Sequence, residues 1–398
     1  MKIVLLTTYY SKNMGYTENC LPRAFSALGH EVHVVTSQYN IYGNAQDYSQ
    51  NYQKFLGDAV QPCGTFQCDG YTVHRLPSRN LFGYIQIKGL AKKIIELNPD
   101  VVHSVAIASL QTYIVALVKP FYKFVIFAEN HHHLSVVKPF LLRSEFSPVK
   151  KVIYWLTRTL PTRLASVAVV RCYAVAPDCL EVAYRFYGVP RSKLALQSLG
   201  TDTELFRPVS NGQEQVNRKD LRTSLGFHSN DLVCVYTGRF TEDKNPALLT
   251  RAISIISAKD NRWKAVFVGE GAQRPEIENN PNCQVVPFMR HAQLADLYRA
   301  VDIAVWPRQE SMSMLDAASC GLPLVVSDSI GESKRIQGNG ITYTDNDLTA
   351  LVDALQILAR DDQRQLLGQV GRKKMVDQFS WEAVARRYEQ DYEKVVQK

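Results

Sequence analysis

Short apolar runs rich in β-branched residues alternate with amphipathic stretches along most of the chain. Near the N-terminus, KIVLLTT is followed by ENCLPRAFSALG and then by EVHVVTS. The runs DVVHSVA, FVIFAEN and SVAVVRCYAV continue this series. Strands that are covered on both faces read as continuous apolar runs, as they do in a parallel sheet packed between helices. The pattern therefore predicts an α/β fold built on a parallel sheet.

A second series of the same kind starts at about residue 231. Its apolar runs are DLVCVYTG, WKAVFVGEG, CQVVPFM, DIAVWP and PLVVSD. The segment between the two series, residues 206–231, is polar and lacks apolar periodicity, as a linker would. A chain of 398 residues also has room for two cores. We therefore predict two Rossmann-like domains, 1–208 and 209–378, with an amphipathic C-terminal helix in 379–398 that packs back on the N-terminal domain.

The net charge and the cysteine pattern limit which cellular compartment and which classes of partner we expect. The net charge of +8 fits nucleic acid, an anionic membrane surface or a phosphorylated substrate. The sequence has no RRM, zinc-finger or helix-turn-helix pattern, so we expect no nucleic-acid partner. The eight cysteines form no CxxC pair, and we find neither a signal-peptide pattern nor an apolar run long enough to span a membrane. These features predict a cytoplasmic protein with free thiols.

Candidate chemistry first appears in the stretch YTGRFTEDKNPALL, residues 236–249. Asn245 followed by Pro246 is a typical helix start, with asparagine as the N-cap residue and proline at the first helical position. Arg239 and Lys244 then flank the positive end of this helix, where free N–H groups and both cations suit phosphate oxygens. The alternative is a solvated turn on which the two intervening acidic residues pair with both cations. Spacing alone supports both interpretations.

A second candidate helix start lies in WPRQESMSMLDAASCGLPLVVSD. Gly321 and the proline two positions later end a short helix, and Ser311 or Ser313 could cap its beginning. Acidic side chains near a helix N-terminus either accept hydrogen bonds from sugar hydroxyls or only complement the helix dipole. Both interpretations stay open for Glu310 and Asp316 on the pattern alone.

Eight pieces of the chain, taken in order, resemble one enzyme family. They are GHEVHVVTS, GTDTELFRP, YTGRFTEDKN, FVGEG, LYRAVDIAVWP, DAASCGLPLVVSD, NGITY and FSWEAVARRYE. In this order they resemble the GT4-type retaining glycosyltransferases, most strongly over residues 195–398. The resemblance implies a GT-B fold, in which two Rossmann-like α/β domains with parallel sheets face each other across a cleft. It also implies a nucleotide-diphospho-sugar donor, here a UDP- or GDP-sugar, bound mainly by the C-terminal domain.

The resemblance also implies roles for individual residues. Arg239 and Lys244 match the family's diphosphate-binding pair, and Gly15 matches a glycine that lets the backbone approach the phosphates. Glu310 and Asp316 correspond to the family's two acids, of which one lies near the donor sugar and the other near the ribose. The remaining positions that the resemblance assigns to the diphosphate are Gly238, Ser311, Ser313 and Met314, and those that it assigns to the nucleoside are Gly269, Glu270, Phe288 and Met289.

The acidic loop departs from the family pattern. The family has two glutamates eight positions apart with a Phe-Gly pair just after the first, whereas Glu310 and Asp316 lie six positions apart and SMS replaces Phe-Gly. Asp316 aligns by its distance from CGLP, but Glu310 aligns only if the loop is shortened. The departure leaves the donor sugar open. It also leaves two alternatives to a transferase: a nucleotide-sugar-binding subunit without transfer activity, and a GT-B nucleotide-sugar epimerase.

Three adjacent histidines follow the run FVIFAEN. The family commonly has a histidine after this strand, near the reacting sugar carbon, so the resemblance implies a catalytic role for His131 or His132. Either could donate a hydrogen bond to the transferred group or shape the acceptor site, and a solvated loop cluster is the alternative. Neighbouring residues of one loop rarely converge on an ion, and the family requires none. We therefore expect no metal at His131, His132 and His133, and no cofactor.

Residues 138–163 mix basic side chains with Phe140, Tyr154 and Trp155. Such a stretch is typical of peripheral docking on an anionic membrane surface, although a core helix with a solvated basic edge is a slightly better explanation. Docking on the inner face of a membrane would fit a polyprenyl-linked acceptor. We therefore expect a hexosyltransferase of bacterial surface polysaccharide or glycoconjugate synthesis that passes its sugar to a glycan or lipid-linked acceptor.

Overall fold

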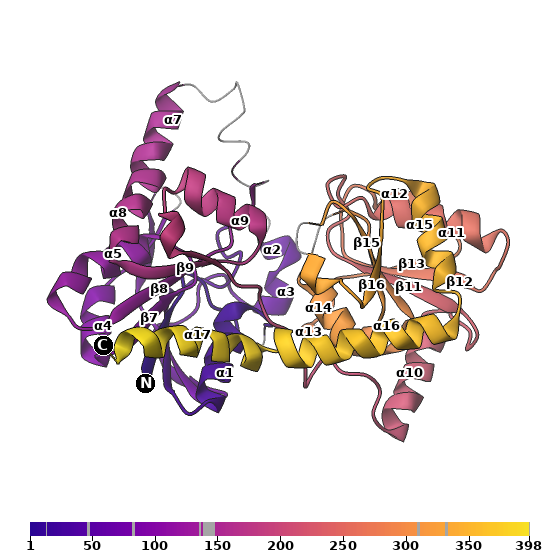
Figure 1. The fold of residues 1–398 in the computed structure, drawn as a ribbon, viewed down its shortest axis with the longest axis horizontal. Coiled ribbons are helices and arrows are strands. Elements are labelled where there is room, and N and C mark those ends of the chain that lie inside the picture. Colours follow the sequence, from indigo (N-terminus) through magenta and orange to yellow (C-terminus); the bar gives the residue numbers. More distant parts are fainter. Residues whose placement is uncertain are drawn as a thin grey trace. The chain divides into compact units, whose positions relative to one another are not determined.

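The chain folds into two compact units, each a β-sheet with helices packed on its faces (Figure 1). One unit is Met1–Leu199 together with Trp381–Lys398, and the other is Gly200–Ser380. The computed structural model describes residues 1–12, 14–45, 48–81, 84–134, 137, 148–308, 311–330 and 333–397.

The division between the units differs in position from the one we predicted. It falls at 199/200 rather than at 208/209. Thr201 forms a parallel β-bridge with Ser380, and its N–H donates to the carbonyl of Phe379 at 2.8 Å. Both ends of the second unit are therefore joined to each other by backbone hydrogen bonding.

The segment that we predicted to be a linker contains a helix, α10 (Gly212–Ser224). Asn211 caps this helix by accepting the N–H of Glu214 at 2.9 Å. Arg222 fastens it to the unit by donating to Asp302 at 3.1 Å and to neighbouring carbonyl groups. The linker prediction was wrong because α10 attaches through arginine side chains, so its sequence lacks the apolar stripe on which the expectation of a helix depends.

The first unit is built on an eight-stranded sheet in the order β10-β9-β8-β7-β1-β2-β4-β3. Its neighbouring strands are parallel, except that β3 and β4 are antiparallel at one edge. The structure confirms the predicted parallel sheet and adds this antiparallel edge strand. The strands are β1 (Lys2–Leu6), β2 (Glu31–Thr36), β3 (Gly64–Cys68), β4 (Tyr71–Arg75), β7 (Val101–Ser104), β8 (Val125–Asn130), β9 (Val169–Ala174) and β10 (Leu194–Leu196), beside a separate hairpin of β5 (Ser78–Leu81) and β6 (Tyr84–Ile87).

The C-terminal helix α17 (Trp381–Val396) belongs to the first unit and packs against α1 (Thr17–Ala27). Phe25 of α1 and Tyr392 of α17 are both buried, with ring centroids 5.7 Å apart. Every helix in the described part of the chain is too short or too polar to span a bilayer. The other helices of this unit are α2 (Tyr48–Asn51), α3 (Gln53–Leu56), α4 (Leu90–Leu97), α5 (Leu110–Val118), α7 (Pro148–Tyr154), α8 (Leu160–Ala168) and α9 (Pro177–Glu181), with short turns η1 (Lys119–Phe121), η2 (Trp155–Thr159), η3 (Val182–Phe186) and η4 (Arg191–Lys193).

The second unit has a six-stranded, fully parallel sheet in the order β13-β12-β11-β14-β15-β16. All of the apolar runs predicted after residue 231 form strands of this sheet. The strands are β11 (Leu232–Thr237), β12 (Trp263–Val268), β13 (Cys283–Val286), β14 (Ile303–Trp306), β15 (Leu324–Ser327) and β16 (Gly340–Tyr343). The helices besides α10 are α11 (Pro246–Ser257), α12 (Arg274–Glu278), α13 (His291–Ala300), α14 (Ser313–Ser319), α15 (Leu348–Ile357) and α16 (Asp361–Lys374), with the turns η5 (Ser333–Arg335) and η6 (Met375–Phe379).

In each unit the first strand lies inside the sheet, and later strands of the chain are added on both sides of it. β11 lies between β12 and β14, and β1 lies between β2 and β7. Loops that leave the carboxyl ends of strands on the two sides of such a switch point diverge, which leaves room for a ligand. The predicted site residues that the structure describes all follow the carboxyl ends of strands. The fold therefore places them on the edges where α/β proteins bind their ligands.

Candidate functional site

The loops after β11 and β12 approach each other through glycines. Gly238 has a φ of 150° and Gly269 a φ of 147°. A Cβ atom on Gly269 would lie 1.9 Å from the carbonyl oxygen of Gly238, and one on Gly271 would lie 2.5 Å from the carbonyl oxygen of Phe240. Glycine accepts these backbone angles and this close approach, whereas other residues do not. The two loops can therefore run in contact along the carboxyl edge of the sheet.

Arg239 projects from this edge, with 73% of its side chain exposed. Its ion pair with Asp243 is 4.0 Å long, at the outer limit of such a contact. Exposed pairs of this kind contribute little to stability, so an anionic ligand could compete for the guanidinium. Lys244 is half-buried in the same loop. The structure thus brings both predicted cations onto one loop beside the switch point.

The first turn of α11 does not offer the free N–H groups that we predicted. Asn245 has a left-handed backbone, with a φ of 49°, and its side chain donates to Asn346 at 3.1 Å instead of capping the helix. An N-cap residue needs an extended backbone to turn its side chain onto the helix, which this angle prevents. The N–H of Ala247 donates to Gln273 Oε1 at 3.2 Å. An anion at this loop would therefore depend on the two cationic side chains.

The loop after β14 leads into α14, the second predicted helix start. Glu310 lies outside the described residues. The N-cap position is occupied by Met312, whose side chain makes no capping bond. Ser311 supports the first turn from one position further back, because its Oγ accepts the N–H of Ser313 at 3.4 Å. The predicted cap at Ser311 or Ser313 is therefore replaced by a weaker contact between the two serines.

Met314 was expected near the diphosphate but is buried in the core of the second unit. Its N–H donates to the carbonyl of Ser311 at 3.1 Å, so that N–H is not directed to a ligand. The indole N–H of Trp306, at the end of β14, donates to the carbonyl of Thr237 at 3.0 Å, at the end of β11. This bond holds together the two strand ends that flank the switch point.

Asp316 lies in the first turn of α14 with its carboxyl group buried. The hydroxyl of Thr201 donates to its Oδ1 at 2.6 Å. Burial raises the pKa of Asp316 to about 7, although the hydrogen bond from Thr201 opposes this shift. Oδ1 is thus engaged within the unit, which leaves Oδ2 as the oxygen that a ligand hydroxyl would use.

The positions expected in the nucleoside pocket follow β12 and β13. Glu270 is exposed and pairs with Arg274 at 2.5 Å. Phe288 is 51% exposed. Met289 is half-buried against the core of the unit. These residues share the carboxyl edge with the cationic loop, since β13, β12 and β11 are neighbours in the sheet.

The corresponding edge of the first unit contains an acidic residue that the sequence analysis missed. Gly15 is half-buried in the loop between β1 and α1. Glu18 follows in the first turn of α1 and is buried, and burial raises its pKa to about 7. It interacts electrostatically with His131 and Glu129. The missed signal was weak, because an acid in the first turn of a helix is usually explained by the helix dipole.

Glu129 is a second missed residue and lies two positions before the predicted His131. It is the penultimate residue of β8 and is fully buried. Its Oε1 accepts from His103 Nε2 at 3.0 Å and from the hydroxyl of Tyr388 at 2.7 Å. Its Oε2 accepts from His131 Nε2 at 2.5 Å. His131 is therefore held by a buried carboxylate, and the alternative of a solvated loop cluster does not describe it.

His132 is bonded to a different partner and points into the first unit. Its Nδ1 lies 2.5 Å from the hydroxyl of Tyr187, which is buried. Burial, and secondarily the charge of Arg158, lower the pKa of His132 to about 4. The ring is therefore neutral near pH 7 and serves the packing of this loop.

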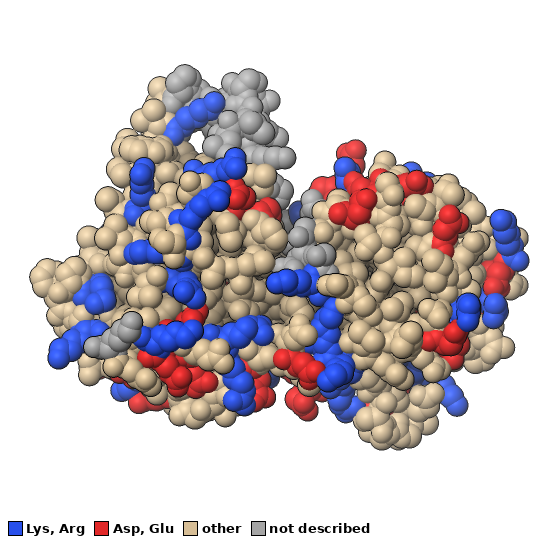
Figure 2. Space-filling model, in the orientation of Figure 1, with Lys and Arg blue, Asp and Glu red and all other residues tan. Residues whose placement is uncertain are grey.

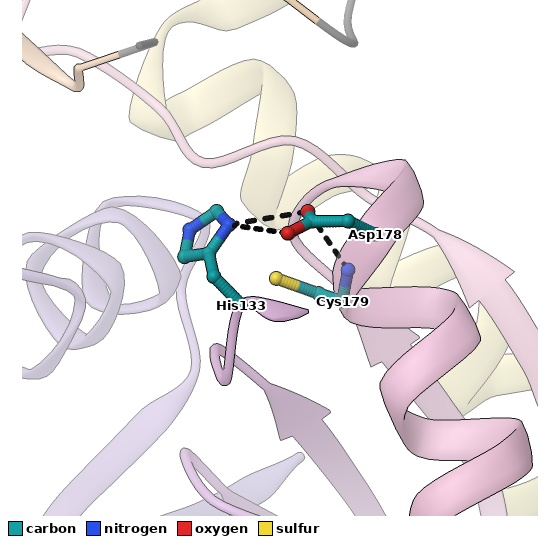
Figure 3. Close-up of side chains that lie close together, drawn as sticks. All are labelled: His133, Asp178 and Cys179. Carbon is teal, nitrogen blue, oxygen red and sulfur yellow. Dashed lines mark hydrogen bonds and ion pairs between the residues drawn. The ribbon is translucent and has the colours of Figure 1, made fainter. Parts of the chain in front are cut away.

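His133 contacts Asp178 and Cys179 in the first turn of α9 (Figure 3). Its Nδ1 lies 3.1 Å from both carboxylate oxygens of Asp178, which also accepts the N–H groups of Leu134 and Cys179. One ligand atom from each of His133, Asp178 and Cys179 lies within 4.8 Å of the others, a spacing that a metal ion could bridge. The hydrogen bonds of Asp178 already account for the arrangement, because they fasten the histidine loop to α9.

The chain has the architecture of the GT-B fold: two α/β units on largely parallel sheets, each with a switch point beside its first strand. Two family profiles match the chain: the one described as "Glycosyltransferase Family 4" over residues 21–205, and the one described as "Glycosyl transferases group 1" over residues 231–361. The chain belongs to the GT4-type glycosyltransferases, as its motifs indicated.

Curated relatives match part of the chain. Spore coat protein SA of Bacillus subtilis is 23% identical over 51% of the chain, and the D-inositol 3-phosphate glycosyltransferase of Xylanimonas cellulosilytica is 26% identical over 52%. These matches span 59% and 52% of the lengths of the two relatives.

Solved structures match the whole fold. A glycosyltransferase from Rickettsia africae has a TM-score of 0.68 at 15% identity and covers 100% of this chain and 99% of its own. HepE of Anabaena in complex with UDP-glucose has a TM-score of 0.66 at 15% identity and covers 99% and 100%. At this level of identity, the likeness shows the fold.

Proposed function

We propose that this protein transfers a sugar from a nucleotide-diphospho-sugar to a glycan or lipid-linked acceptor. The observation that supports this most is the loop after β11, where Arg239 is exposed and Lys244 lies five positions further along. A guanidinium that can bind two oxygens and a compact ammonium suit the two phosphates of such a donor. The glycine contacts between the loops after β11 and β12 fix where the cationic loop lies against its neighbour. UDP- and GDP-sugars are the donors to test first.

In the proposed reaction, the acceptor oxygen bonds to the anomeric carbon while the bond from that carbon to the diphosphate breaks. The electron pair of the broken bond leaves with the nucleoside diphosphate, which takes up the proton of the acceptor hydroxyl. Arg239 and Lys244 would stabilise the negative charge that develops on the leaving group, a preorganised electrostatic contribution. Attack on the face that the diphosphate leaves would retain the anomeric configuration. The scheme assigns no step to a metal ion or cofactor.

His131 is the histidine that we propose to act near the transferred sugar. It is anchored by Glu129, yet 30% of its side chain is exposed. Glu18 lies close enough to interact with it electrostatically. A partly exposed imidazole beside two carboxyl groups can donate a hydrogen bond to a sugar hydroxyl or accept one from it. His132 is a weaker candidate, since its ring is engaged with Tyr187.

We further propose that α7 and the η2 turn after it dock on an anionic membrane, where a lipid-linked acceptor would be found. Val149, Val152, Ile153 and Leu156 have helical spacing and are each at least half exposed. For the described residues 148–163, this exposed apolar stripe favours docking over the alternative of a core helix. Trp155 is also exposed, and basic side chains gather over the part of the surface that α7 and α8 form (Figure 2). Apolar side chains flanked by lysine and arginine suit an interface with anionic lipid.

The proposed setting is bacterial surface polysaccharide or glycoconjugate synthesis. The chain is 30% identical over 166 residues to a protein of Bacillus subtilis named putative glycosyltransferase EpsF, which covers 39% of this chain. A cytoplasmic enzyme at the inner face of the membrane would meet both a nucleotide-sugar and a polyprenyl-linked glycan.

Thermal-shift screening of UDP-, GDP-, ADP- and dTDP-sugars tests the donor site directly. At least one donor should stabilise the wild-type protein, and Arg239→Ala and Lys244→Ala should each weaken that stabilisation. Each lost charge-assisted contact should reduce donor binding by roughly 1.5–3 kcal/mol. Donor shifts that are unchanged in both variants would exclude this site.

Arg262→Ala and Lys259→Ala are matched controls for the two cations. Both residues lie just before β12, at the amino edge of the sheet and thus at the edge opposite to Arg239. They should leave the donor shift unchanged. Incubation with labelled donor and membrane extract then separates the alternatives: a binding subunit gives no labelled acceptor, and an epimerase gives a changed sugar without transfer.

Vesicle sedimentation tests the membrane contact. The wild-type protein should sediment with vesicles of phosphatidylglycerol and phosphatidylcholine but not with phosphatidylcholine alone. Val152→Ser combined with Ile153→Ser should reduce this binding, whereas Ile255→Ser, an exposed apolar residue on α11, should not. Equal sedimentation of both variants with anionic vesicles would contradict the proposal.

A further inference from the structure

A chain of hydrogen bonds runs from His131 at the end of β8 to the C-terminal helix α17. His131 Nε2 lies 2.5 Å from Glu129 Oε2, and His103 Nε2 lies 3.0 Å from Glu129 Oε1. The hydroxyl of Tyr392 lies 2.5 Å from Nδ1 of His103. Glu129, His103 and Tyr392 are fully buried. The chain thus links a partly exposed ring to a helix at the other end of the sequence through groups that water does not reach.

The carboxylate sets the direction of each bond. Burial acts to raise the pKa of Glu129, but hydrogen bonds from His103 and His131 outweigh burial and lower it. An ionised carboxylate only accepts, so both rings must donate to it through Nε2. In the neutral ring of His103, Nδ1 is then an acceptor for the hydroxyl of Tyr392, and the hydroxyl of Tyr388 is a second donor to Oε1. One consistent arrangement therefore satisfies the whole group.

We propose that Glu129 is a positioning residue that keeps the proton of His131 on Nε2 and leaves Nδ1 for the substrate. Second-shell carboxylates orient histidine rings in this way by accepting one ring N–H. Nδ1 of His131 makes no hydrogen bond within the described part of the chain. What His131 does with Nδ1 depends on the proposed transfer function, but the location of its proton does not. Tyr388 and the His103–Tyr392 pair connect Glu129 to α17.

The substitution Glu129→Gln gives a sharp test because it keeps the shape and removes one acceptor. Two donors, His103 and Tyr388, converge on Oε1, so the single carbonyl oxygen of glutamine should stay with them. The NH₂ group of the glutamine would then face His131 and donate to Nε2, which must therefore be unprotonated. The expected result is a change of the neutral ring from the Nε2-protonated to the Nδ1-protonated tautomer.

Nitrogen NMR of protein labelled in its nine histidines reads this change directly. The His131 signals are assigned from their loss in His131→Ala. Tyr392→Phe removes a hydroxyl that is three hydrogen bonds away from His131, so it should leave the His131 tautomer as in the wild type. A bare Nε2 in the wild-type neutral ring, or a protonated Nε2 in folded Glu129→Gln, would overturn the proposal. The wild-type spectrum alone decides the matter if Glu129→Gln does not fold.

Transfer rates separate positioning from a merely structural role. Glu129→Gln should lower kcat by roughly tenfold or more while the KM for the donor changes little. In a His131→Ala background the same substitution should have no further effect on kcat, because a positioning residue acts through its partner. An equal loss in both backgrounds would overturn the proposal. If the wild-type protein transfers no sugar, the proposed function fails, and the ring spectra still test the positioning.

Discussion

The carbonyl oxygen of Gly238 lies 1.9 Å from the place that a Cβ atom on Gly269 would occupy. The two glycines directly follow the neighbouring strands β11 and β12, and the N–H of Gly238 donates to the carbonyl of Val268 at 3.0 Å. The contact therefore fixes the spacing between the loop with Arg239 and the loop after β12. Because Gly269 also has a φ of 147°, both its backbone angle and its surroundings exclude a larger residue.

Gly269→Ala should destabilise the second unit by roughly 2 kcal/mol or more, since strain and overlap with backbone act together. The free energy of donor binding should fall by more than the free energy of unfolding. The reason is that the cationic loop must move away from the strand end. Urea unfolding and donor titration measure the two effects. Gly212→Ala is the control: its Cβ would meet nothing within 4 Å and would lie in the first turn of α10. A folded Gly269→Ala variant with wild-type donor affinity would contradict the prediction.

The fold was predictable because burial on two faces leaves a strong signal. Runs such as FVIFAEN and DLVCVYTG form β8 and β11 in their sheets. The edge strand β3 and the helix α10 were not predictable in this way. Both are polar, and α10 is attached through Arg222 to Asp302 rather than through an apolar stripe.

The candidate site was predictable only where residues of suitable chemistry lie close together in the sequence, on one loop. Arg239 and Lys244 are such a pair, and the structure places them together beside the switch point. Glu129 could not be found, because it stands within an apolar run and its partner Tyr388 is 259 positions away. Asn245 was assigned a capping role that its left-handed backbone prevents, and sequence patterns do not fix that angle.

The raised pKa of Asp316 predicts a dependence of stability on pH. Its pKa is about 7 in the folded protein, against an ordinary value of 3.8, so the folded state binds more protons between these values. Stability should therefore fall as pH rises through this window, by up to roughly 4 kcal/mol from this group. Asp316→Asn keeps the acceptor for Thr201 but cannot ionise. Relative to the wild type, this variant should gain stability between about pH 4 and pH 8.

Urea unfolding at a series of pH values measures this gain. Asp260→Asn is the control, because a hydrogen bond from Arg262 lowers the pKa of Asp260. Its contribution is present at neutral pH and lost as pH falls through the lowered pKa, so that variant should change in the opposite sense and by less. A constant difference between Asp316→Asn and the wild type across the series would show that Asp316 is not a buried carboxyl group.

The cluster of His133, Asp178 and Cys179 provides a test of the metal-free scheme. Asp178 accepts two backbone N–H groups and contacts His133, and these bonds lower its pKa although burial opposes them. Asp178→Ala should cost roughly 1.5–3 kcal/mol of stability because the N–H groups lose a charged acceptor. Transfer by the wild-type protein should be unchanged after removal of metal with EDTA. A rate that falls with EDTA and returns with Zn²⁺, but not in His133→Ala, would instead identify this cluster as a metal site.

The three adjacent histidines should differ in their effects on transfer. His131→Ala should lower kcat by roughly 10²-fold while donor affinity in the thermal-shift assay changes little, because the ring is proposed to act on the transferred sugar rather than on the diphosphate. His132→Ala is the matched control: its ring is neutral near pH 7 and its Nδ1 is engaged with Tyr187. Its loss should remove one hydrogen bond of the buried Tyr187 hydroxyl, which also bonds to Tyr154. This should cost roughly 0.5–1.5 kcal/mol of stability, with a small effect on kcat. The opposite order of the two kcat values would assign the role to His132, and unchanged transfer in both variants would remove histidine from the proposed reaction.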